Sequence, residues 1–308
     1  MENIINPIAK NILKAELTPQ LFVRTTNNGS NHIYILNHHN APNVMQEIAR
    51  LREVTFRASG GGTGLALDID ENDTCAVPYQ QLIVWNPIDE EIVGGYRYIK
   101  CKDAVLKDGT INLSTAHLFN YSNDFITNYF DTTIELGRSW IQPNYQPSSE
   151  NRKGLFSLDN LWDGLGALVV DNADVTHFFG KVTMYTHYNV EARDMLLAFM
   201  QYYFADNDKL VTPIHGVKHK FELSSFYHLF EGLNYKDGHK VLNQHVRALG
   251  ENIPPLINSY MNLSATMKTF GTAVNDLFGD VEETGILVKI ADIYDSKKER
   301  HVQSYTKQ

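Results

Sequence analysis

Short apolar runs bounded by turn-forming residues predict buried strands at several places along the chain. Residues 91–100 and 133–141 are rich in β-branched, aromatic and small residues, which favour strands. Residues 81–85 form a similar run, and the turn residues 86–89 connect it to residues 91–100, which predicts a β-hairpin. Two further strands are expected in the second half of the chain, over 175–185 and 285–293.

Apolar positions spaced by three and four residues predict helices between these strands. In residues 40–57 the apolar stripe begins just after Asn43, a residue type that often caps a helix N-terminus. Residues 191–206 have a similar amphipathic spacing. Further helices are expected over 1–26, with an exit at Thr18–Pro19, over 125–130 and 158–170, and as a helix or turn over 253–267.

The order of these elements predicts the fold class. Strands and helices alternate irregularly, and hairpins occur beside crossovers, which favours an α+β fold with a mixed sheet flanked by helices. No internal repeat or linker divides the chain, so residues 1–308 are expected to form a single domain. Its His-rich part, at about 205–255, is expected to be a helical elaboration.

Composition and charge narrow the class of protein. With 43% hydrophobic and 20% charged residues, the 308-residue chain falls in the soluble globular class. Its net charge of −9 argues against a nucleic-acid partner. The N-terminal residues lack the apolar core of a signal peptide, and no run approaches the ~18 apolar residues of a membrane span. A cytoplasmic location is therefore expected.

Cysteines and histidines give no sign of a disulfide scaffold or a metal site. Cys75 and Cys101 are the only cysteines, and the twelve histidines are scattered without a ligand motif. A glycine-rich stretch at 59–64 follows a helix and has no lysine at the P-loop position. We interpret it as a flexible loop for substrate entry and not as a nucleotide site.

Ionisable residues inside two predicted strands are the first candidates for chemistry. Arg97 lies in residues 91–100, and Glu135 and Arg138 lie in residues 133–141. Such residues are seldom buried without a partner, so neighbouring strands that each carry a charge suggest a polar site. The alternative is an Arg–Glu pair that only ties the two strands together.

Three motifs together resemble one family: GGYR at 94–97, ELGRS at 135–139 and NLWDGL at 160–165. The chain resembles the acyl-homoserine-lactone-synthase-like branch of the GNAT acyltransferases over about 45–290. It is most similar to the ornithine-lipid and glycine-lipid N-acyltransferases, which include Bacteroidetes members often labelled hemolysin-like. Further matching segments are LREVTFR at 51–57, LDIDENDTC at 67–75, and residues 253–288.

The resemblance implies a GNAT-like core that transfers a fatty acyl group, 3-hydroxylated or plain, to the amine of an amino acid in aminolipid biosynthesis. Glycine is the first choice of acceptor and ornithine the second. The motifs imply catalytic roles for Glu135, Arg138 and Arg97, and substrate-binding roles for Arg52, Phe56, Asp70, Asp73 and Trp162. Asp68 is an alternative to Asp70, because the acidic stretch can be aligned in more than one way.

These residue types suit the attack of an amine on a thioester. The reaction needs a proton acceptor for the ammonium group and donors for the developing oxyanion. Glu135 can accept the proton, directly or through a water. Arg97 or Arg138 can bind the acceptor's carboxylate with both arms of its fork.

The expected donor is a thioester of acyl carrier protein, whose phosphopantetheine arm would enter the site. Residues 141–157 contain one glycine and two prolines, and proline has no amide donor, so a tight cradle for the pyrophosphate of acyl-coenzyme A is not expected. Arg152 and Lys153 are candidate docking charges for the acidic carrier. No permanently bound cofactor is expected.

Two other functions stay open at this point. An acyl-homoserine-lactone-type synthase would need a site for S-adenosylmethionine, which nothing in the sequence demands. A membrane-active, hemolysin-like protein without enzymatic activity would usually carry a signal peptide, disulfides or a membrane span. Peripheral contact with the inner membrane face could still arise through a lipid product.

Overall fold

The predicted hairpin lies at the centre of an antiparallel sheet in a computed structural model, which describes residues 1–146 and 154–307. Its two strands are β3 (Gln80–Asn86) and β4 (Glu91–Lys100). The sheet continues with two strands beyond β3 and with another strand beside β4. These outer strands are β2 (His32–Leu36), β1 (Phe22–Thr25) and, next to β4, β6 (Thr133–Ile141).

The chain divides into two units, each with its own strands and helices. The first comprises Met1–Ser114, Asp131–Thr176 and Asp295–Gln308, and the second comprises Thr115–Phe130 and His177–Tyr294. The single domain expected over 1–308 stays a prediction, because compactness alone does not decide whether one unit can fold without the other.

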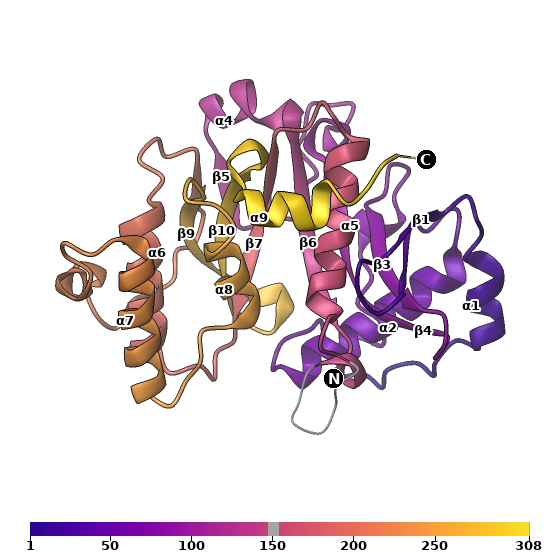
Figure 1. The fold of residues 1–308 in the computed structure, drawn as a ribbon, viewed down its shortest axis with the longest axis horizontal. Coiled ribbons are helices and arrows are strands. Elements are labelled where there is room, and N and C mark those ends of the chain that lie inside the picture. The colour runs from indigo at the N-terminus through magenta and orange to yellow at the C-terminus, as the bar shows by residue number, and fades with distance from the viewer. Residues whose placement is uncertain (147–153, 308) are drawn as a thin grey trace. The chain divides into compact units, whose positions relative to one another are not determined.

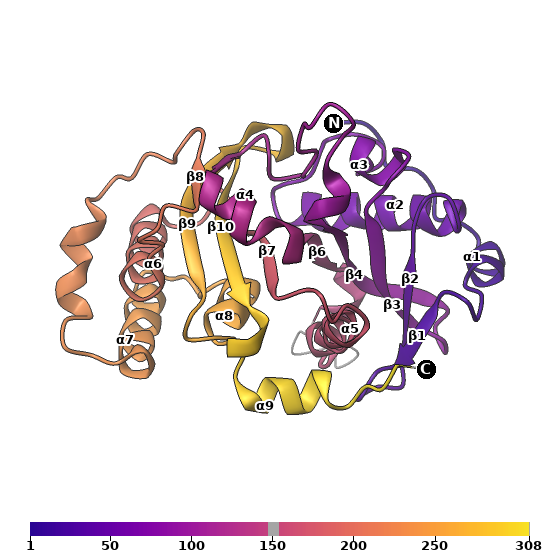
Figure 2. The same ribbon diagram turned by 90° about the horizontal axis from the view of Figure 1, so that it is seen from above.

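Helices cover both faces of the sheet in the first unit. Figure 2 shows α2 (Pro42–Ala58) and α5 (Ser157–Asp171) on opposite sides of β3, β4 and β6. The face toward α5 is apolar and tightly packed: a Cβ at Gly164 of α5 would stand 2.6 Å from the Leu82 side chain. Shorter helices of this unit are α1 (Lys10–Glu16), α3 (Glu71–Thr74) and α9 (Asp295–Lys297).

The start of α2 corrects one expectation. Its N-cap is Ala41, with Pro42 in the first helical turn, so the prediction of Asn43 as the N-cap is wrong. The open backbone N–H groups of Asn43 and Val44 instead donate to the carboxylate of Glu16 at 2.9 Å each. A carboxylate from α1 therefore replaces the local cap, which spacing along α2 could not reveal.

The second unit contains the sheet β7–β10–β9, in which all neighbours are antiparallel. Helix α6 packs on β9 and beside α7, as Figure 1 shows. The His-rich region forms β8, a 3-10 segment at Leu223–Leu229 and α7. The α+β class is confirmed. The unit's elements are β5 (Phe119–Tyr121), α4 (Asn123–Asn128), β7 (His177–Met184), α6 (Val190–Phe204), β8 (Val211–Pro213), α7 (Tyr235–Ala248), α8 (Pro255–Met261), β9 (Lys268–Asn275) and β10 (Val281–Lys289).

Candidate active site

Several elements of the first unit bring charged residues to one face of its sheet. In the register of β4 with β6, Arg97 and Glu135 fall on the same face, because side chains alternate along each strand. Arg52 reaches this face from α2. Asp70 and Asp73 reach it from the start of α3, where they form a reciprocal capping box. Segments far apart in sequence thus meet at one buried polar site.

Carboxylates alternate with guanidinium groups in this site. The carboxylate of Asp68 accepts hydrogen bonds from Nε of Arg52 at 3.0 Å and from Nε of Arg138 at 2.9 Å. Oδ2 of Asp73 accepts from Nη1 of both Arg52 and Arg97 at 3.2 Å. Each buried charge is therefore compensated by opposite charges, as a low-dielectric environment requires.

Asp70 completes this network. Its two carboxylate oxygens accept hydrogen bonds from Nη1 of Arg97 at 2.8 and 2.9 Å. Gln81 of β3 adds a bond from its amide nitrogen to Asp73 at 3.0 Å. The structure thus brings Asp68, Asp70 and Asp73 together, and each contacts an arginine. Which of Asp68 and Asp70 binds substrate stays a prediction.

The network shifts the protonation of its acids. Burial alone would raise the pKa of Asp68, but Arg138 and Arg52 outweigh it and hold the pKa of this carboxyl well below its usual range. Burial likewise raises the pKa of Asp70, and Arg97 is the largest of the opposing influences that lower it. Both acids are thus anionic at neutral pH.

Arg138 is held in an unusual backbone conformation. Its φ is +46°, in the left-handed region that few residues other than glycine adopt. At this point the register between β4 and β6 shifts, so two residues of β6 oppose one of β4. Such a bulge re-aims a side chain, here toward Asp68, and backbone strain of this kind is concentrated at functional sites. The side chain of Arg138 keeps 12% of its surface exposed, whereas that of Arg52 has none.

Glu135 is fully buried among hydrogen-bond donors. Its Oε2 accepts from the hydroxyl of Tyr79, and from the backbone N–H and the hydroxyl of Ser114 at 3.2 Å each. Burial and the charge of Glu135 raise the pKa of Tyr79 well above its ordinary value. The phenol therefore stays protonated and acts as the hydrogen-bond donor to Glu135. The guanidinium of Arg97 lies over the Tyr79 ring, 5.0 Å from its centre. Tyr79 therefore lies between Arg97 and Glu135.

One edge of the Arg97 guanidinium has no protein partner among the described residues. Its hydrogen bonds run from Nη1, whereas Nε is buried without a partner and no bond is made by Nη2. These two N–H groups are parallel and match a carboxylate. Gly137 lies beside this edge, since a Cβ there would stand 3.6 Å from Nε and 3.7 Å from the Ser114 hydroxyl.

Comparison with known proteins shows which family the chain belongs to. The GNAT acetyltransferase domain matches residues 51–152, the segment that carries most of the charged network. A glycine N(alpha)-acyltransferase of Bacteroides thetaiotaomicron is 53% identical over 306 residues, which cover 99% of this chain and 91% of the relative. A protein of the same name from Phocaeicola vulgatus is 51% identical over 309 residues, covering 100% and 95%.

This chain belongs to the GNAT acyltransferases. It is an N-acyltransferase of the branch that contains these two relatives. Among solved structures, a CoA-dependent acyl-homoserine lactone synthase, BjaI, with MTA, aligns over 89% of each chain at 10% identity and a TM-score of 0.40. A likeness that distant adds nothing to the assignment.

Not all residues expected in the acyltransferase site join the network. Phe56 is buried near the end of α2. Trp162 is half-buried on α5, which covers the opposite face of the sheet from Arg97. The substrate-binding roles of these two residues stay predictions. Arg152 and Lys153, the candidate docking charges, lie outside the described residues.

Sequence reasoning missed Tyr79 and Ser114. Both lie in irregular segments, Tyr79 just before β3 and Ser114 well after β4, so neither belongs to a periodic pattern. The one available signal is Tyr79 next to a strand that leads to the GGYR segment. In the glycine-rich loop, the N–H groups of Thr63 and Gly64 donate to the buried carboxylate of Glu53 at 3.0 and 2.8 Å. The role of this loop in substrate entry stays a prediction.

The part of the chain that the structure describes holds neither a metal-binding cluster nor a membrane-spanning helix. Across residues 1–146 and 154–307, no three His, Cys, Asp or Glu residues are placed to hold a metal ion together. Within the same ranges, every helix is too short or too polar to cross a lipid bilayer.

Proposed function

We propose that this acyltransferase transfers a fatty acyl group from the thioester of acyl carrier protein to the amine of glycine, in aminolipid biosynthesis. The observation that supports an amino acid as the acyl acceptor is the unpartnered Nε–Nη2 edge of Arg97 beside Gly137, which can bind a carboxylate. The names of the two relatives that match almost end to end support glycine independently.

The carboxylate of glycine would bind to this edge of Arg97. A buried N–H without a partner costs about 1–3 kcal/mol, which a bound carboxylate would recover with two charge-assisted bonds. The charge of Arg97 is secure, because Asp73 and Asp70 outweigh the effect of burial and raise its pKa well above the ordinary value. Asp70 and Asp73 also fix the orientation of the fork through Nη1.

Glu135 would accept the proton that the glycine ammonium must lose, directly or through one water. The free amine then attacks the thioester carbon, the C–S bond breaks, and the carrier thiol leaves with a proton as the amide forms. The Tyr79 and Ser114 donors hold Glu135 in one orientation, which keeps its distance from the amine constant. No residue needs to form a covalent intermediate with the acyl group.

The donor is the part of the proposal that rests on the sequence. The two prolines and single glycine of residues 141–157 disfavour a pyrophosphate cradle, so acyl carrier protein is preferred to coenzyme A. A peripheral contact with the membrane would follow from release of an acylated amino acid, which is amphipathic.

The test is an assay of the purified protein with acyl carrier protein or coenzyme A thioesters of the same acyl chain and with glycine, ornithine or serine. Mass spectrometry should find N-acylglycine, with kcat/KM higher for glycine than for the larger amino acids and higher for the carrier thioester. Faster turnover of ornithine would reject glycine as the acceptor. Equal efficiency with both donors would reject the preference for carrier protein, and absence of any amide would reject the function.

A further inference from the structure

The second unit contains a cavity of about 370 Å³, and none of the residues of the charged network lines it. It lies between α6 and the edge strand β9, where Gly271 has a φ of +86° and the register with β10 shifts. Its volume is at the lower end of the range of ligand pockets, ~300–1,000 Å³, and would hold about twelve water molecules at ~30 Å³ each. Buried apolar side chains of its wall are Leu197, Met200 and Phe270.

Two threonine hydroxyls at the buried side of this cavity are hydrogen-bonded to each other, and one of their two O–H groups has no acceptor among the described residues. Thr272 of β9 and Thr284 of β10 are cross-strand partners, and their Oγ1 atoms are hydrogen-bonded at 2.7 Å. Both side chains are buried and line the cavity. A hydroxyl pair has two O–H groups, and only one of them is used between the two oxygens. No other hydrogen bond of these hydroxyls is found in the described residues, so one O–H can donate to a ligand.

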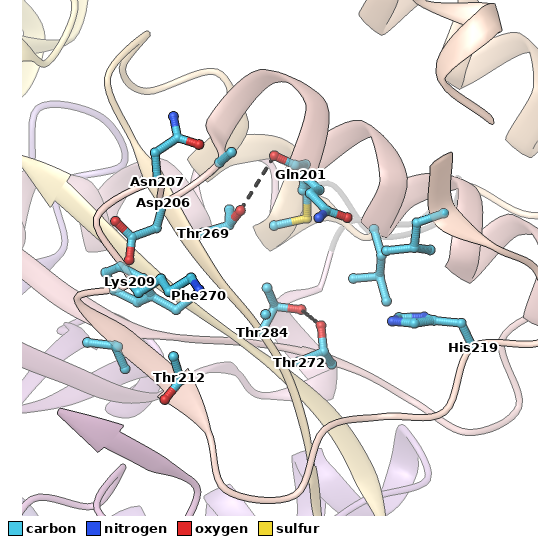
Figure 3. A pocket seen from close by; sticks show the side chains of 16 residues that line it. Gln201, Asp206, Asn207, Lys209, Thr212, His219, Thr269, Phe270, Thr272 and Thr284 are labelled. Atoms are coloured by element: carbon cyan, nitrogen blue, oxygen red, sulfur yellow. Dashed lines mark hydrogen bonds between the residues drawn. The ribbon is translucent and has the colours of Figure 1, made fainter. Parts of the chain in front are cut away.

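His219 supplies the complementary group. Its Nδ1 lies 3.3 Å from Oδ1 of Asp194, a fully buried carboxylate that also accepts from the backbone N–H groups of Lys220 and Phe221 at 2.8 and 3.0 Å. Because this carboxylate can only accept, Nδ1 of His219 carries the hydrogen, and in the neutral ring Nε2 is left as an acceptor. In Figure 3 the imidazole points into the pocket, on the side where Thr272 and Thr284 lie.

A donor and an acceptor beside apolar walls match a small polar group that both accepts and donates a hydrogen bond. A hydroxyl can accept from the threonine pair and donate to His219 at the same time, whereas a carbonyl or ether oxygen can only accept. We propose that this cavity binds a small aliphatic molecule that carries a hydroxyl group, with its carbon chain against Leu197, Met200 and Phe270. The inference concerns a second site and does not depend on which acceptor or donor the transfer reaction uses.

The test compares 3-hydroxyhexanoate with hexanoate, which differ only in the hydroxyl group. Both carry a carboxylate, so any attraction to Lys209 at the rim is the same for both. Titration calorimetry with the wild-type protein should show 3-hydroxyhexanoate binding roughly five- to thirtyfold more tightly, as one or two hydrogen bonds would give. In the double variant Thr272→Val, Thr284→Val the two affinities should become equal.

The double valine variant should fold normally, because replacing both partners of a hydrogen bond with apolar groups of the same shape is nearly neutral for stability. A melting curve checks this. His219→Phe provides a second route, because its side chain is partly exposed and the change removes the acceptor without disturbing the sheet. It should lower the preference for the hydroxylated compound. Thr212→Val, on the exposed rim, is the matched control and should keep the wild-type preference.

Three results would overturn the proposal. Equal affinities of the two compounds for the wild-type protein would mean that the hydroxyl is not recognised. An unchanged preference in both the double valine variant and His219→Phe would place recognition elsewhere. Failure of both compounds to bind would mean that the cavity holds water only.

Discussion

The hydroxyl of Tyr79 donates a hydrogen bond to Oε2 of Glu135, although the two residues are 56 positions apart in sequence and both are buried. The backbone N–H of Ser114 donates to the Tyr79 oxygen at 2.8 Å and to the same carboxylate oxygen at 3.2 Å. A buried carboxylate without donors would be costly, so these bonds both stabilise the fold and fix the orientation of Glu135.

Tyr79→Phe should therefore slow the reaction without abolishing it. The variant keeps the ring beneath Arg97 and the Ser114 donors, but Glu135 loses one of the groups that orient it. We expect kcat to fall between roughly 10- and 100-fold, with the KM for the amino acid changed much less.

Tyr145→Phe is the matched control for this variant. Tyr145 is also buried and also donates to a carboxylate, Asp89 at 2.7 Å, but it lies outside the charged network. Both variants should lose about 1 kcal/mol of stability. Only Tyr79→Phe should lower kcat, and equal kinetics of the two variants would show that Tyr79 is purely structural.

Glu135→Gln tests the proton acceptor itself. The glutamine oxygen can still accept from Tyr79 and Ser114, so the fold should be retained while the basic group is lost. Turnover should fall by roughly 10²-fold or more. Glu47→Gln, which changes a buried carboxylate bound to Arg50 in α2, should leave turnover unchanged. A folded Glu135→Gln protein with near-normal activity would leave Glu135 as a structural residue.

The long, periodic elements could be read from the sequence, and the short ones could not. The predicted strand over 133–141 coincides with β6, and the predicted hairpin coincides with β3 and β4 to within a residue. The strands β1 and β9 were not predicted, because neither has an apolar run long enough to stand out. The strand β2 was not predicted either, although its apolar run at 33–36 is as long as that of β3. The expected helix over 1–26 is only the seven-residue α1, after which the chain enters β1.

In the site, the sequence could identify individual residues but not the pairs that they form. Arg97, Glu135, Asp70 and Asp73 could be found because each lies in a strand or motif with a recognisable pattern. Their partners could not be assigned, since pairing depends on how distant segments meet. The hydrogen bonds to Glu135 come from Tyr79 and Ser114, and Arg138 pairs with Asp68, 70 positions away.

Arg97→Lys tests the carboxylate site. Lysine keeps the charge but loses the parallel Nε and Nη2 donors, so the KM for glycine should rise at least about tenfold while the KM for the donor stays nearly constant. Stability should fall too, because Arg97 holds Asp70 and Asp73. Arg193→Lys, which disturbs a buried arginine paired with Asp194, controls for that loss and should leave both KM values unchanged. Equal losses for both substrates would assign Arg97 a structural role only.

Asp68→Asn should reveal how stability depends on pH. The folded-state pKa of Asp68 is depressed, so its contribution is fully present above the unfolded value of about 3.9 and is lost as pH falls toward the folded value. Near pH 7 the variant should be less stable by roughly 3–5 kcal/mol, because Arg52 and Arg138 lose a buried anion. In urea titrations this difference should be constant from pH 7 to 5 and shrink from pH 4 to 3. A constant difference down to pH 3 would contradict the depressed pKa.

Gly137→Ala tests whether the space beside Arg97 is where glycine binds. The backbone of Gly137 is outside the left-handed region, so alanine fits without strain, and its methyl group would lie at van der Waals distance from Arg97 Nε and the Ser114 hydroxyl. The fold should therefore persist, while a carboxylate at that edge would collide with the methyl group. We expect the KM for glycine to rise roughly tenfold, with little change in the KM for the acyl donor. Gly216→Ala, at an open position of the second unit, should change neither constant. If Gly137→Ala binds glycine normally, the carboxylate must lie elsewhere, and Arg138, the most exposed arginine of the charged network, becomes the next candidate.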